Sequence, residues 1–135
     1  MRLISVALLA LTLSGCAAIQ SANLLTTEDE LSLGKQFDAE ISKEAEFLED
    51  PEIVGYVDDL TQRLAKVCKR ADIEYHVRVV VSDEINAFAV PGGFLYVNLG
   101  LMRAAKSEAE LAGVMGHEIG HVVGRHGAKH MTQQM

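Results

Sequence analysis

The sequence predicts an α+β fold: a helical amino-terminal part, a small sheet with an edge strand, and a long helix that carries a His-Glu-x-x-His pattern. Three patterns support this prediction. Apolar residues recur at helical spacing between residues 27 and 70, valines alternate in "YHVRVVV", and a capped apolar pattern starts at Ser107. With 135 residues, 49% of them hydrophobic, the chain has the composition of one globular domain. Its formal net charge of −7 argues against nucleic acid as a partner.

The first residues have the pattern of a secretory signal peptide. Arg2 precedes an apolar run over residues 3–13 that is too short to span a bilayer, and small residues lead to Cys16. The stretch "LSGC" resembles the lipobox of bacterial lipoproteins, which implies cleavage before Cys16 and a lipid on its thiol. A plain secretory signal is the alternative.

Three segments follow from this interpretation of the amino terminus. We expect a lipoprotein signal peptide, a lipid-anchored tether and one folded domain, over residues 1–15, 16–26 and 27–135. Ala17 follows the cysteine, which in lipoproteins of Gram-negative type implies attachment to the outer membrane on its periplasmic face. Once Cys16 carries lipid, Cys68 has no partner, so no internal disulfide is expected.

Two helices are expected before the sheet. Thr27 and Glu30 have the spacing of a capping box, and Asp50-Pro51 ends the first helix and begins the second, which runs to about Arg70. The apolar stripe of the second helix is expected to pack in the core; its members are Ile53, Val54, Val57, Leu60, Leu64 and Val67.

The sheet is expected to follow Asp72. "YHVRVVV" predicts one strand, and "INAFAVPGGFLYVNLG" predicts two short strands joined by a reversal at residues 91–93. A hairpin of this kind leaves an edge strand.

The last helix carries the motif "GHEIGHVVGRH". Ser107 and Glu110 form a capping pattern, so the motif lies within the helix. His117 and His121 are four residues apart and point about 40° apart, so both imidazoles can bind one metal. Glu118 is turned about 100° from His117, which suits a base for a metal-bound water better than a ligand. This division of roles is the one that a zinc hydrolase needs.

Glycines also recur along this helix, within about 80° of arc; they are Gly113, Gly116, Gly120, Gly124 and Gly127. Each glycine costs up to about 1 kcal/mol relative to alanine inside a helix. We therefore expect another element to approach this glycine face closely.

Several stretches resemble the zinc metallopeptidase family that includes the CAAX prenyl proteases, HtpX and the mitochondrial OMA peptidase. They are "NAFAVPGG", "LYVNLGLM" and "SEAELAGVMGHEIGHVVGRH", and "DELSLGKQFDAEI" and "DPEIVGYVDDLTQRLA" resemble the preceding helices of its periplasmic lipoprotein members. The resemblance implies one Zn²⁺ per complete catalytic domain, bound by His117 and His121, with Glu118 as the catalytic base of peptide-bond hydrolysis. It also implies that residues 27–135 are a zinc metallopeptidase domain, with unfolded or misassembled envelope proteins as substrates.

An extended substrate is expected to bind by strand addition, which recognises backbone more than side chains. The expected strand is either the one after Gly93 or the one before the reversal, formed by Asn86, Ala87, Phe88, Ala89 and Val90.

The third zinc ligand is missing from the pattern. His126 comes one residue too early for the metzincin spacing, and on a continuous helix it would project about 140–180° from the ligand pair. We therefore expect a structural role for His126 and His130. The resemblance points instead to a glutamate from a later helix, but no Asp or Glu follows Glu118, so we expect the sequence to be an amino-terminal portion or a truncated product. The alternative function is a non-catalytic lipoprotein adaptor or holdase that keeps the peptidase scaffold and binds unfolded chains.

Overall fold

The computed structural model describes residues 24–134 and confirms the α+β prediction. In chain order its elements are α1 (Thr27–Glu44), α2 (Pro51–Val67), β1 (His76–Val80), β2 (Ala87–Val90), β3 (Phe94–Asn98), α3 (Leu99–Ala104), α4 (Glu108–Val123) and α5 (His126–Gln134). The predicted signal peptide and the lipidation site at Cys16 lie outside the described residues. None of the helices within 24–134 combines the length and apolar character needed to cross a membrane.

The sheet has the strand order β1-β3-β2, with β1 parallel and β2 antiparallel to β3. The predicted hairpin is therefore confirmed. β3 is paired on both sides, so the strand after Gly93 is wrong as a candidate for strand addition. β2 is paired with β3 alone among the described strands, which leaves it as the edge strand of the hairpin.

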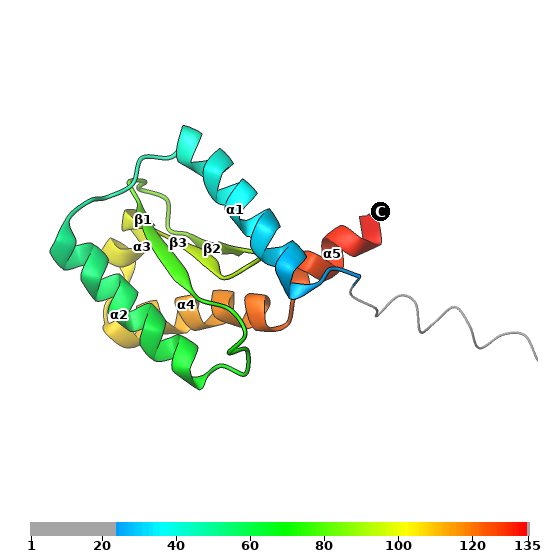
Figure 1. Cartoon of the computed structure of the whole chain (residues 1–135). Coiled ribbons are helices and arrows are strands. Elements are labelled where there is room, and N and C mark those ends of the chain that lie inside the picture. The colour runs from blue at the N-terminus through cyan, green and yellow to red at the C-terminus, as the bar shows by residue number, and fades with distance from the viewer. Residues whose placement is uncertain (1–23, 135) are drawn as a thin grey trace, which may run out of the picture.

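The two faces of the sheet are covered by different helices (Figure 1). Because side chains alternate along a strand, Leu95 and Val97 of β3 point to one face and Tyr96 to the other. Val97 belongs to the core cluster that the sheet shares with α2 and α4, in which Val57 and Met115 are fully buried. This cluster fixes α4 against the sheet.

α1 lies on the opposite face and is attached to it by polar contacts as well as packing. The Tyr96 hydroxyl donates to Asp38 Oδ1 at 2.7 Å, and Arg78 Nη1 donates to the Ser42 hydroxyl at 2.7 Å. Burial and the hydrogen bond to Asp38 raise the pKa of the Tyr96 hydroxyl. The phenol therefore stays protonated and remains a donor to α1.

The beginning of α1 differs from the prediction by one residue. Thr26 is the N-cap: its hydroxyl accepts from the Asp29 N–H at 3.1 Å, and its own N–H donates to the Asp29 carboxylate at 2.8 Å. The predicted pair of Thr27 and Glu30 is wrong because both side chains have partners elsewhere: the Thr27 hydroxyl donates to Asp72, and Glu30 is buried.

The ends of the first two helices also differ from the prediction. α1 ends at Glu44 rather than at Asp50, because the next residues run beside β1, where the Leu48 N–H donates to the Val79 carbonyl. α2 ends at Val67, which is 83% exposed and therefore wrong as a core residue. The short helix α3 was not predicted, since six residues are too few for a clear apolar period.

The reversal between β2 and β3 depends on glycine. Gly92 and Gly93 have φ of 88° and 92°, a conformation that other residues rarely adopt. This turn lies against α1, where a Cβ on Gly34 would come within 2.2 Å of the Pro91 carbonyl oxygen. The hairpin is thus in direct backbone contact with the first helix.

Candidate metal centre

The position of the histidines follows from how α4 begins and packs. The Ser107 hydroxyl accepts from the Glu110 N–H at 3.2 Å, which confirms the predicted N-cap. Met115 and Ile119 are buried against the sheet and α2, so the other side of α4 faces outward. His117 and His121 lie on that outer side and are exposed, while Glu118 is half-buried.

The three residues of the predicted motif come together in the structure. Their candidate ligand atoms all lie within 4.8 Å of one another, and His117 Nε2 is 3.0 Å from His121 Nε2. Two nitrogens on a tetrahedral zinc ion, with bonds of about 2.0–2.1 Å, would be about 3.3 Å apart. The spacing and the donor types therefore fit a zinc ion, with His117 and His121 as the residues that would hold it.

The helix does not continue to His126, contrary to the prediction. α4 ends at Val123, Gly124 follows as its cap, and Arg125 has φ of 55°, which turns the chain before α5 starts. The expected projection of His126 away from the pair is therefore wrong. Instead His126 Nδ1 lies 2.7 Å from His121 Nδ1, whereas His130 on α5 is exposed.

A buried charge cluster holds this turn in place. Glu30, only 1% exposed, accepts a hydrogen bond from Arg70 at 2.7 Å and a second one from Arg125. Arg70 also donates to the Val122 carbonyl at 3.0 Å, close to the end of α4. Sequence reasoning missed this cluster because Glu30 is 40 residues from Arg70 and 95 from Arg125, and no local pattern joins them.

The predicted close packing on the glycine face is wrong for the middle of α4. A Cβ added to Gly113, Gly116 or Gly120 would meet no atom within 4 Å among the described residues. The last two glycines do have close neighbours. A Cβ on Gly124 would lie 2.5 Å from His126 Nε2, and one on Gly127 would lie 3.2 Å from Pro91 Cγ.

The edge strand borders the metal centre. A cavity of about 550 Å³ separates Ala89 of β2 from Glu118 and His121, and His126 also lines it. The Asn98 N–H donates to the Asn86 carbonyl, and hydrogen-bonded pairs alternate along an antiparallel ladder. The amide and carbonyl groups of Ala87 and Ala89 are therefore directed away from β3.

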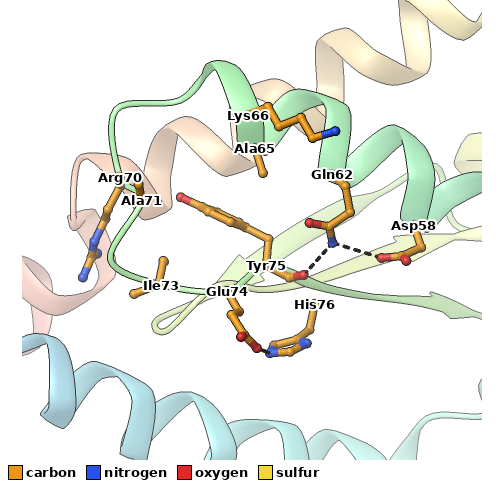
Figure 2. A pocket seen from close by; sticks show the side chains of 10 residues that line it. All are labelled: Asp58, Gln62, Ala65, Lys66, Arg70, Ala71, Ile73, Glu74, Tyr75 and His76. Carbon is orange, nitrogen blue, oxygen red and sulfur yellow. Dashed lines mark hydrogen bonds and ion pairs between the residues drawn. The ribbon is translucent and has the colours of Figure 1, made fainter.

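A second cavity, of about 520 Å³, lies between α2 and the segment that leads into β1 (Figure 2). Gln62 spans it, donating to Asp58 and to the Tyr75 carbonyl at 3.1 and 2.9 Å. Arg70 lines this cavity, but its guanidinium is bound to Glu30 and Asp72. The cavity shares no lining residue with the one beside the histidines.

Residues 52–135 match the family described as Peptidase family M48. The chain belongs to this family. It is 32% identical to the beta-barrel assembly-enhancing protease of Escherichia coli K12 over 114 residues, which are 84% of this chain and 23% of the relative. It is 34% identical to the putative beta-barrel assembly-enhancing protease of Vibrio cholerae over 114 residues, 84% of this chain and 24% of that relative.

Mitochondrial metalloendopeptidases are also similar to the chain. It is 37% identical to the mitochondrial metalloendopeptidase OMA1 of Arabidopsis thaliana over 98 residues, which are 73% of this chain and 20% of the relative. The chain spans about a quarter of the length of the curated bacterial relatives that it matches.

Proposed function

We propose that the protein is a zinc-dependent endopeptidase that hydrolyses peptide bonds in misfolded or misassembled envelope proteins. One observation carries the proposal: two imidazole nitrogens 3.0 Å apart lie beside Glu118, at a cavity bordered by an edge strand. Membership of Peptidase family M48, and relatives described as a protease and as metalloendopeptidases, support it.

Each residue of the site has a role in this reaction. A zinc ion bound by His117 and His121 would lower the pKa of a bound water and polarise the scissile carbonyl. Glu118, on the same face of α4, accepts the proton of the attacking water and returns it to the leaving amine. Glu118 is half-buried and lines the cavity beside His121, so it can reach a water molecule held there.

The substrate binds as an additional strand on β2. Ala87 and Ala89 offer outward amide and carbonyl groups, and Ala89 also borders the cavity that contains Glu118. A segment paired here is recognised through its backbone, so an unfolded stretch of many sequences is suitable. The names of the bacterial relatives refer to beta-barrel assembly, and unpaired barrel strands are segments of this kind.

The proposed location is the periplasmic face of the outer membrane. The anchor is a lipid on Cys16, with residues 1–15 removed as the signal peptide and residues 16–26 as the tether. The bacterial relatives, whose names refer to beta-barrel assembly, support an envelope location.

The substitution Glu118→Gln tests the proposal in the full-length protein. The amide keeps the shape of the side chain but cannot take a proton, so we expect zinc to remain bound and cleavage of unfolded casein to fall at least about 100-fold. Glu84→Gln, on an exposed loop, is the matched control and should change neither zinc binding nor casein cleavage.

Two results would contradict the proposal. Undiminished cleavage by the Glu118→Gln protein would show that Glu118 is not the catalytic base. A protein that holds one zinc ion per chain and binds unfolded chains but cuts none would favour the adaptor or holdase instead.

A further inference from the structure

His126 lies against the metal centre although it comes one residue too early for the metzincin ligand spacing. Its Nδ1 is 2.7 Å from His121 Nδ1, and the two ring centroids are 5.0 Å apart. His121 thus has a ring on each side: its Nε2 faces His117 Nε2, and its Nδ1 faces His126.

The chemistry of imidazole determines which ring nitrogens donate and which accept hydrogen bonds among these three histidines. A neutral histidine carries one proton, so a ring that offers the Nε2 lone pair to a metal keeps its proton on Nδ1. Zinc-binding histidines almost always donate this second N–H to an acceptor, which fixes the tautomer and the ring orientation. For His121, the atom within hydrogen-bond distance of Nδ1 is His126 Nδ1.

The backbone around Gly124 makes room for this contact. The His126 ring occupies the space where a Cβ on Gly124 would be, since that Cβ would lie 2.5 to 3.0 Å from three of the ring atoms. Gly124 itself has φ of −71° and ψ of −8°, which any residue adopts. An added Cβ at this position would therefore displace the His126 ring without straining the backbone.

Arg125 holds the turn that brings His126 back toward α4. Its φ of 55° is unusual for a residue with a side chain. The guanidinium donates to buried Glu30 and to the Leu25 carbonyl, so contacts with the start of α1 stabilise the turn.

We propose that His126 is a positioning residue for the metal centre: it accepts a hydrogen bond from His121 Nδ1–H and thereby directs His121 Nε2 toward the zinc ion. This inference rests on the proposed zinc site of His117 and His121. Direct ligation of the same ion by His126 does not fit, because the two nitrogens of the His121 ring point in divergent directions and His126 lies on the side opposite His117.

Zinc affinity of the full chain tests the inference, measured by competition of Zn²⁺ with a chromophoric chelator. His126→Ala should weaken zinc binding about 10–100-fold, the usual loss when an outer-shell partner is removed. His126→Gln, whose amide oxygen can accept the same hydrogen bond, should recover part of the loss. His76→Ala removes an exposed histidine of β1 that does not line the cavity beside the metal centre, and it should leave the affinity unchanged.

A matched pair of glycine variants tests the same contact without altering any histidine. Gly124→Ala places a methyl group where the His126 ring lies and should weaken zinc binding. Gly113→Ala adds the same methyl to an open position of α4 and should not. The pair also keeps the inference testable if the His126→Ala protein fails to fold.

A second measurement needs no metal. Long-range ¹H–¹⁵N correlation spectra of the metal-free protein should show His121 protonated on Nδ1, and this preference should disappear in His126→Ala and in Gly124→Ala. Unchanged zinc affinity and unchanged tautomer in folded His126→Ala protein would overturn the inference. A Co²⁺ absorption spectrum that loses one nitrogen ligand in that variant would also overturn it, since His126 would then be a ligand.

The outcomes separate this inference from the proposed function. If the wild-type chain binds no zinc, or if His117→Ala binds it equally well, the proposed zinc site fails, while the tautomer of His121 still decides the role of His126. If the wild type binds zinc through His117, and the His126 variants change neither the zinc affinity nor the tautomer of His121, the inference alone is wrong.

Discussion

A glutamate in the first turn of a helix normally faces solvent and interacts with the positive helix end. Glu30 has this position in the sequence, but its side chain is buried between Arg70 and Arg125. The burial of charge is tolerated because each carboxylate oxygen has a guanidinium partner. Glu30 joins α1, the loop after α2 and the turn after α4, so one side chain stabilises three segments.

Removal of Glu30 should therefore be costly. Glu30→Ala leaves two arginines without their buried partner and should lower the free energy of unfolding by about 3–5 kcal/mol. Asp83→Ala is the control: Asp83 pairs with Arg103, but their side chains are 93% and 67% exposed, and loss of such a pair costs about 0–1 kcal/mol. Urea unfolding measures the loss of unfolding free energy in each variant. Similar urea midpoints for the two would show that the buried charge cluster contributes little to stability.

The same residues show why parts of the site could not be predicted. His117, Glu118 and His121 lie on one helix, so their convergence follows from helical periodicity alone. The position of His126 depends on a turn at Arg125, and that turn depends on Glu30, which is 95 residues away in the sequence. A local pattern carries no information about such a contact, so the sequence favoured a continuous helix.

At the level of elements, the predictions succeeded where a periodic pattern was long. The alternation in β1, the glycine reversal between β2 and β3, and the N-cap at Ser107 were confirmed. The end of α1 was predicted too late, because pairing of residues 46 and 48 with β1 is a tertiary contact. The strand order was likewise not determined by local pattern, and it is this order that leaves β2 at the edge.

The middle of α4 is open at its glycines rather than closely packed, whereas α5 is packed against its neighbours, and this difference predicts how two leucine substitutions affect stability. Ala128 of α5 is 1% exposed, so Ala128→Leu should overpack the contact between α5 and its neighbours and destabilise the domain by about 1–3 kcal/mol. Gly120→Leu, at an open position of α4, should be neutral or stabilising, since leucine favours helix by up to about 1 kcal/mol over glycine.

Thermal unfolding compares the two leucine variants directly. A midpoint that falls more for Gly120→Leu than for Ala128→Leu would mean that another element covers the middle of α4 after all.

For the molecule as a whole, the donor count at the metal centre sets the expected affinity. A catalytic zinc site has three protein ligands and leaves the fourth position for water. The structure brings two imidazoles together beside Glu118, which is needed as the base, and no Asp or Glu follows Glu118 in the sequence. We expect these 135 residues to bind zinc weakly and to cleave no substrate.

Addition of a downstream helix that carries a glutamate within reach of the histidine pair should raise zinc to one ion per chain and bring activity with it. Elemental analysis after dialysis against a weak chelator measures the zinc content. Stoichiometric zinc and cleavage of casein by the 135-residue chain alone would show that it contains a third ligand, and His126 and His130 would be examined first.

The predicted lipid anchor is tested on the intact protein in its cell. Cys16→Ser removes the thiol that accepts the lipid, so the protein should move from the membrane fraction to the soluble fraction. Cys68→Ser, in the folded domain, is the control and should leave the distribution unchanged. A Cys16→Ser protein that still sediments with outer membranes after a high-salt wash would show that the lipid is not the anchor.

The ion pair between Glu30 and Arg125 also has a consequence for the order in which the protein is made. The two residues are 95 positions apart, so α1 leaves the ribosome long before the turn after α4 exists. Until Arg125 emerges, Glu30 has only Arg70 to neutralise it, and the turn that places His126 beside His121 cannot be held. The contact between His121 and His126 can therefore form only after residues 125 and 126 have been synthesised, when the residues of α1, α2 and the sheet have already left the ribosome.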